Sequence, residues 1–127
     1  MHPALEVLST LIIGQCEPAL GRTAEGNRLI DPVLPTILAG DMIGIPPTLP
    51  EVIGMTGHAS IWVEEWDRAE LVLDRLVEAT RDASALGRLI YPLAARSHLA
   101  FRRGRWQAAL ADAGDIEIQL YAEAVVE

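Results

Sequence analysis

Two histidines carry the most versatile chemistry in this sequence. His58 and His98 are separated by 40 positions. An imidazole titrates near neutral pH and can donate or accept a hydrogen bond, so the pair suits a groove that binds a peptide or a small ligand. The alternative interpretation is that each is an ordinary helix histidine, partly buried and bonded to neighbouring backbone. Two histidines without a third ligand make a weak metal site, and we expect neither a metal nor a cofactor.

Several other residues recur at the same separation. The pairs are Ile61 with Phe101, Trp66 with Trp106, Ala69 with Ala109, and Leu73 with Ala113. Trp106, Ala109 and Ala113 also follow the helical spacing i, i+3, i+7, which predicts that they share one buried face. A fixed separation of this kind indicates a repeat of two helical hairpins.

The repeat predicts where a binding groove lies. In a stack of hairpins the first helices line the concave side and the second helices the convex side. We therefore expect one stripe on the helix at 49–64 to lie beside its equivalent on the next first helix. The predicted groove residues are Glu51, His58, Ile61, Trp62, Tyr91, His98, Phe101 and Arg102. Their mixture of rings, imidazoles and charges suits a ligand with apolar and polar ends. Trp66 and Trp106 are expected in the core, whereas core and groove are equally open for Trp62.

The elements that position these residues give an all-α fold of antiparallel helical hairpins stacked in one domain spanning 1–127. Residues 1–44 are expected to form degenerate or capping helices: one from Pro3 that Gly14 ends, one opening at Pro18, and one from Asp31 to Ile43. Prolines 46 and 47 break the chain, and Thr48 with Glu51 fits a capping box.

Two hairpins follow, at 49–82 and 88–126. The first has a helix to Glu64, a turn near Glu65, and an amphipathic helix with a buried stripe of Trp66, Ala69, Leu73, Leu76 and Val77. The second has a helix at 89–103, a turn at Gly104, and a last helix from Trp106 to Val126. An edge strand at 116–118 is the alternative there.

Composition narrows the function classes. The net charge is −8, which argues against direct nucleic-acid binding by this chain. A single cysteine, Cys16, excludes an internal disulfide and suits a reducing cytoplasm. No apolar run is long enough for a membrane span, and no basic segment precedes the first apolar residues as in a secretory signal. We expect a cytoplasmic location.

The two hairpins resemble tetratricopeptide repeats. Each has a small residue midway along its first helix (Gly57, Ser97), then a tight turn, then the tryptophan and alanine described above. The stretch LDRLVEATRDASALGRLIYPLAARSHLAFRRGRWQAALADA is more narrowly similar to the helical-repeat arm of large bacterial LuxR-family transcriptional regulators, the maltotriose-regulator-like proteins. The resemblance covers about 49–113. It implies a non-catalytic arm that senses a ligand or binds a protein, and that belongs to a transcription regulator. ATP and DNA binding would reside in other domains, since this chain has no P-loop and no basic recognition helix.

Two other classes remain open. One is a stand-alone helical-repeat adaptor that begins at Met1 and forms homodimers. The other is a small helical enzyme, although no serine has a nucleophile-elbow context and only a spatial pairing could bring Cys16 to His58.

Arg102, Arg103 and Arg105 are either a solvated turn or a contact for an acidic partner. The last helix is apolar enough that we expect it to meet a partner chain or to fold back on residues 1–44.

Overall fold

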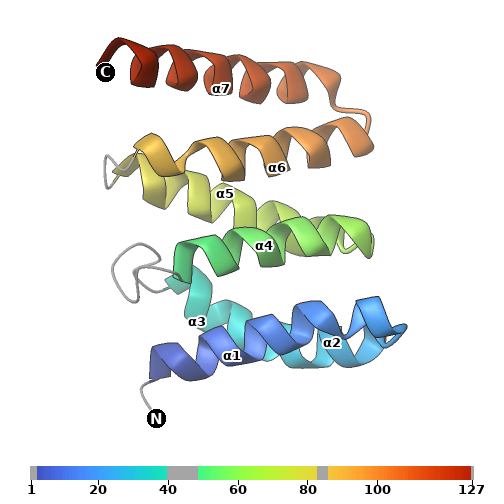
Figure 1. Ribbon diagram of the computed structural model, residues 1–127. Helices are drawn as coiled ribbons and strands as arrows, with labels where there is room; N and C mark the ends of the chain where they lie inside the picture. Colours follow the sequence, from blue (N-terminus) through green and yellow to red (C-terminus); the bar gives the residue numbers. More distant parts are fainter. Residues whose placement is uncertain (1–2, 40–48, 83–85, 127) are drawn as a thin grey trace.

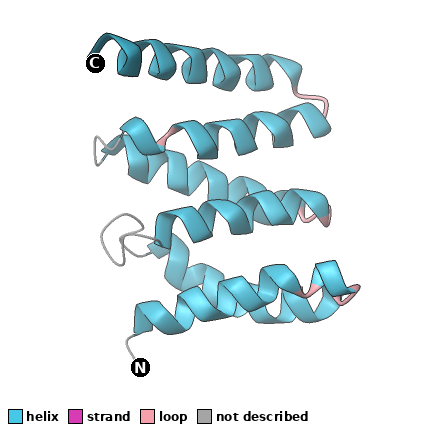
Figure 2. Cartoon of the chain, in the orientation of Figure 1, coloured by secondary structure: helices cyan, strands magenta, loops and turns pink. Residues whose placement is uncertain are grey.

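The computed structural model describes residues 3–39, 49–82 and 86–126, and helices make up nearly all of this part of the chain (Figure 1). No strand occurs among these residues (Figure 2), so the predicted all-α class is confirmed and the edge strand at 116–118 is wrong. The α-helices are α1 (Pro3–Cys16), α2 (Thr23–Ile30), α3 (Leu34–Ala39), α4 (Leu49–Trp62), α5 (Trp66–Asp82), α6 (Ile90–Arg102) and α7 (Trp106–Val126). Short 3-10 turns lie at Pro18–Leu20, Asp31–Val33 and Leu86–Arg88.

Three helical hairpins form, in each of which the two helices run in opposite directions and pack together: α1 with α2, α4 with α5, and α6 with α7. Contacts of α1 with α4 and of α6 with both α4 and α5 join the pairs into one stack. Figure 1 shows α1 and α7 at opposite ends of this stack. The last helix therefore does not fold back on the first hairpin, and that half of the prediction is wrong.

The three hairpins share one turn geometry. Gly21, Glu64 and Gly104 have positive φ angles of 79°, 61° and 74°. The residue after each of them donates its amide to the carbonyl five positions earlier, from Arg22, Glu65 and Arg105, at 2.9, 2.9 and 2.8 Å. This bond satisfies a carbonyl left free at a helix end, and it is typical of a left-handed cap. The first hairpin therefore repeats the turn that the sequence predicted only for the later two.

Small residues bring the two helices of each hairpin together at equivalent positions. In the first hairpin a Cβ on Gly26 would lie 2.6 Å from the carbonyl oxygen of Gly14. In the second, a Cβ on Gly57 would lie 2.8 Å from Leu73. In the third, the Ser97 hydroxyl donates to the carbonyl of Ala109 at 2.8 Å. Gly14 is thus a contact residue inside α1, which continues to Cys16, and the prediction that Gly14 ends the helix is wrong.

Apolar clusters fill the spaces between the pairs. One cluster joins the first hairpin and α3 to the second hairpin through residues that include Leu11, Ile30, Ile53 and Leu76. A second joins α4 and α5 to α6, and it consists of Ile61, Ala69, Leu73, Ala95 and Leu99. The predicted stripe on α5 is buried as expected, except that Trp66 is only half-buried at its edge.

Buried polar side chains fix the relative positions of the first two hairpins. Arg68 on α5 is buried and donates to Ser60 on α4 at 2.8 Å and to Asn27 on α2 at 2.7 Å. Gln15 on α1 donates to the hydroxyl of Thr56 on α4 at 2.5 Å. A buried guanidinium requires such partners, so Arg68 specifies how α2 sits against α4 and α5.

Element boundaries differ from the predictions mainly in the first 44 residues. The single helix expected from Pro18 is divided at Gly21, whose left-handed backbone reverses the chain. The helix expected to run from Asp31 to Ile43 is a 3-10 turn followed by α3, described as far as Ala39. The capping box of Thr48 with Glu51 and the break at Pro46 and Pro47 involve positions outside the described residues.

Replacement of Ala109 by leucine should lower the free energy of unfolding by about 1–3 kcal/mol. Ala109 is buried and its carbonyl accepts the Ser97 hydroxyl, so the added atoms would separate α6 from α7. Chemical denaturation followed by circular dichroism measures the change. Ala113→Leu is the control, because Ala113 is exposed in spite of its predicted burial. Equal stability of Ala109→Leu and the unmodified chain would contradict the packing of α7.

Candidate functional site

The two histidines of the repeat lie side by side on the α4 and α6 surface. Their ring centroids are 5.8 Å apart and the rings meet edge to face. Both side chains are half-buried, His58 on α4 and His98 on α6. The separation of 40 positions therefore predicted a real contact between first helices of successive hairpins.

Trp62 and Arg102 extend this pair along the same surface. The indole of Trp62 lies 5.4 Å from the His98 ring and 6.1 Å from the His58 ring. The guanidinium of Arg102 lies 5.9 Å from Trp62 and 5.5 Å from Trp66, within the range of cation–π attraction. Because 62% of the Trp62 surface is exposed, this tryptophan belongs to the surface cluster and not to the core.

Tyr91 completes the cluster through a hydrogen bond to His58, with its hydroxyl oxygen 3.0 Å from Nδ1. Burial, with a smaller effect from the charge of His98, lowers the pKa of His58. Burial raises the pKa of the Tyr91 phenol. Both shifts favour the neutral forms, so at pH 7 a neutral imidazole and a neutral phenol share this bond. We call His58, Trp62, Tyr91, His98 and Arg102 the aromatic cluster.

The remaining predicted groove residues, Glu51, Ile61 and Phe101, are not part of the aromatic cluster. Ile61 is fully buried beneath α6 and is a core residue, so its assignment to the groove is wrong. Phe101, its equivalent on α6, is 63% exposed because no further helix covers it in the described chain. Phe101 lines an open groove between α6 and α7 that His98 also lines, so these two predicted groove residues share one groove. Glu51 is exposed at the rim of a mostly apolar cavity of about 600 Å³, which Tyr91 also lines.

Trp106 is also displaced from its predicted place. The sequence favoured the core, but the side chain is 70% exposed at the start of α7. Its equivalent Trp66 is half-buried against the cluster under α6. The difference follows from position in the stack, since the last hairpin of the described chain has no hairpin packed on it.

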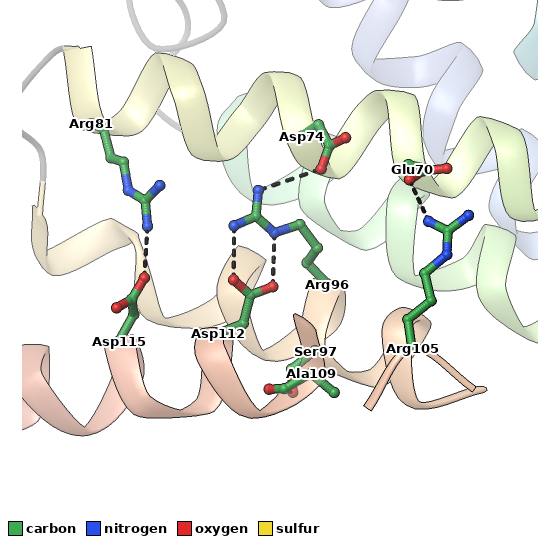
Figure 3. A network of polar contacts seen from close by, with 9 residues as sticks. All are labelled: Glu70, Asp74, Arg81, Arg96, Ser97, Arg105, Ala109, Asp112 and Asp115. Atoms are coloured by element: carbon green, nitrogen blue, oxygen red, sulfur yellow. Dashed lines mark hydrogen bonds and ion pairs between the residues drawn. The ribbon is translucent and has the colours of Figure 1, made fainter. Parts of the chain in front are cut away.

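A polar network on the other side of α6 was missed by the sequence interpretation (Figure 3). Arg96 donates two hydrogen bonds of 2.8 Å to the carboxylate of Asp112 on α7, and one of 3.3 Å to Asp74 on α5. Arg103 and Arg105 both donate to Glu70, at 2.9 and 2.8 Å. Arg96 therefore links α5, α6 and α7. Arg103 and Arg105, for which the sequence left a solvated turn and an acidic contact open, are paired with a carboxylate of the same chain. The sequence carries no local signal for this network, because its partners are 16 to 35 positions apart.

The aromatic cluster brings together groups that can stack and form hydrogen bonds. It has imidazole, phenol, indole and guanidinium groups, and within the described part of the chain its hydrogen bonds and ring contacts join no serine, threonine or cysteine to a histidine. Among the described residues there is no group of three or more metal-binding side chains, and the histidine pair has no carboxylate beside it. Rings and a cation on an open surface can hold an aromatic or anionic group by stacking and charge-assisted hydrogen bonds.

Comparison with family models, curated proteins and solved structures finds no match for this chain. The class of protein is thus defined by the fold and the cluster alone: an all-helical stack with an exposed aromatic surface site. Of the helices in the described ranges, none combines the length and apolar character needed to cross a membrane.

Proposed function

We propose that this chain is a non-catalytic, tetratricopeptide-like arm that senses a ligand or binds a protein, as in LuxR-family transcriptional regulators. Three observations support a tetratricopeptide-like array: the shared turn geometry, the pairing of helices, and the small residues at equivalent contact points. The sequence resemblance over 49–113 supports the LuxR-family assignment. A bacterial cytoplasmic setting follows from that assignment.

The aromatic cluster is the observation that carries the binding function. Exposed aromatic rings that gather in one patch typically mark a binding site. Here five side chains from α4 and α6 converge on one surface. Arg102 forms a long ion pair with Glu64, with a nitrogen–oxygen distance of 4.0 Å, and the Glu64 side chain is 69% exposed. A carboxylate on a ligand can displace this weak pair and gain a charge-assisted hydrogen bond. We expect a small ligand or a peptide segment that combines an aromatic ring with a carboxylate.

The double substitution His98→Ala with Arg102→Ala should weaken binding of such a ligand by about 1–3 kcal/mol, because charge-assisted hydrogen bonds are lost. N-acetyltryptophan is a suitable probe, since it carries an indole and a carboxylate. Binding is measured by NMR titration of the tryptophan indole and histidine ring signals.

Arg28→Ala is the matched control, because Arg28 is an exposed arginine on α2, distant in the stack from the cluster. The control should bind the probe as the unmodified chain does. Unchanged binding by the double variant, with an intact circular dichroism spectrum, would show that the aromatic cluster is not the site.

A stand-alone adaptor is the second candidate, and the apolar surfaces at both ends of the stack favour it. The coding sequence distinguishes the two. A reading frame that continues into a helix-turn-helix domain supports the regulator arm, whereas a stop codon after Glu127 supports the adaptor.

A further inference from the structure

The last hairpin presents an apolar face with no partner among the described residues. We call this the tail face, and it is formed by Phe101, Trp106, Leu110 and Ala113. All four side chains are exposed, and they line an open groove of about 650 Å³ between α6 and α7. Repeat arrays need polar outer faces on their terminal hairpins to stay soluble as monomers. The tail face has no such cover.

The preceding hairpin shows what fits on this kind of face. Its equivalent residues, 40 positions earlier, are Ile61, Trp66, Glu70 and Leu73. Ile61, Leu73 and Trp66 pack with Ala95 and Leu99 of α6, which are buried. Pro92, three positions before Ala95 on the same helix, is also buried, so that Pro92, Ala95 and Leu99 form a buried stripe of α6 at spacings of three and four residues. A helix that lies parallel to α6 and presents small apolar residues at this spacing would therefore fit the tail face.

The first helix of the same chain has that stripe. The three shared turns place the hairpins 43 and then 40 positions apart, at 21, 64 and 104. Ser9, Ile12 and Cys16 on α1 are thus the equivalents of the α6 stripe, and all three are exposed. The Ser9 hydroxyl is already bonded to the carbonyl of Leu5 at 2.7 Å, so it needs no partner outside its helix. We call Ser9, Ile12, Cys16 and Leu20 the head face.

The residue types at one pair of equivalent positions support the fit of the head face to the tail face. Within the stack, Arg103 donates to Glu70 across the junction of α6 with α5. At the two free faces the equivalent positions carry Leu20 and Leu110, which are 65% and 68% exposed. An ion pair inside the stack is thus replaced by two leucines at its ends. Both of these equivalent positions are apolar, as a contact between head and tail requires.

We propose that a second copy of this chain covers the tail face with its head face, so that α1 of one copy continues the stack beyond α7 of another. This contact is heterologous, and repeated addition extends the array unless the rotation closes a ring. His98 of the aromatic cluster also lines the groove between α6 and α7, but the proposal rests on the head and tail faces and not on a ligand of that cluster.

Self-association of the purified chain tests the proposal, because it should require both the head face and the tail face. The mass measured by analytical ultracentrifugation should rise with concentration. Ile12→Arg in the head face and Leu110→Arg in the tail face should each weaken association by about tenfold or more, because a buried unpaired guanidinium opposes contact. A mixture of these two variants should form a one-to-one dimer, since one copy keeps its tail face and the other its head face. Leu71→Arg is the control, because Leu71 is exposed on α5 in the middle of the stack.

A cross-link distinguishes head-to-tail contact from a symmetric tail-to-tail dimer. Leu99 and Leu73 belong to one buried cluster, so their equivalents Cys16 and Ala113 should meet between copies. Ala113→Cys should then be linked to the native Cys16 of another copy by a short bismaleimide. The same variant with Cys16→Ala should not be linked. Linking in the Cys16→Ala background, dimers of Ile12→Arg alone, or a strictly monomeric unmodified chain would each overturn the proposal.

Discussion

Replacement of Asp112 by alanine should lower the free energy of unfolding by about 2–4 kcal/mol. The Asp112 side chain is 9% exposed and receives both hydrogen bonds from Arg96, whose side chain is 24% exposed. Its removal leaves a partly buried guanidinium with only the longer bond to Asp74. The cost is below that of a fully buried pair, because Arg96 keeps some access to water. Thermal and chemical denaturation measure the loss.

Two further variants identify the cause of this effect. Asp115→Ala removes the neighbouring Arg81–Asp115 pair, in which both side chains are 45% exposed, and it should cost less than about 1 kcal/mol. The double variant Arg96→Met with Asp112→Leu should recover part of the loss, since it leaves no unpaired charge between α6 and α7. Asp112→Ala with the stability of the unmodified chain would show that the network does not hold α7.

Replacement of Gly26 by valine should lower the free energy of unfolding by about 3 kcal/mol, near the upper end for overpacking. The first added atom would lie 2.6 Å from the backbone oxygen of Gly14, and 3.1 Å from Pro18. A backbone oxygen cannot turn aside as a side chain can, so α1 and α2 must separate. That separation also disturbs the buried cluster that includes Leu11 and Ile30. Equilibrium denaturation in urea gives the value.

Gly114→Val is the matched control for this prediction. Gly114 also lies inside a helix, but a Cβ there would meet no atom within 4 Å. Its free energy of unfolding should stay within about 0.5 kcal/mol of the unmodified chain, as for other surface substitutions. An equal loss from Gly26→Val and Gly114→Val would mean that contact between α1 and α2 does not determine the effect, since valine has a higher helix propensity than glycine.

The sequence by itself determined the helical class and the register between the second and third hairpins. The separation of 40 positions placed His58 beside His98 and made Ala109 a contact residue, as the structure confirms. It also placed turns at Gly104 and next to Glu65, where the φ angles are positive at Gly104 and Glu64. Helix geometry repeats every 3.6 residues, so a regular spacing is enough to predict which side chains share a face.

The tertiary structure decided which of two equivalent positions is covered. Ile61 is buried and Phe101 is exposed, although the repeat gives them the same place, because α6 lies over only the first of them. It also revealed the first hairpin, where Gly14 and Gly26 take the places of Gly57 and Ala69 and no tryptophan marks the turn. The hydrogen-bond partners of Arg68 and Arg96 were also decided by the tertiary structure, because only packing brings side chains from distant helices within hydrogen-bond distance. Local spacing contains no information on which helix lies next to which, and burial and ion pairing both depend on that neighbour.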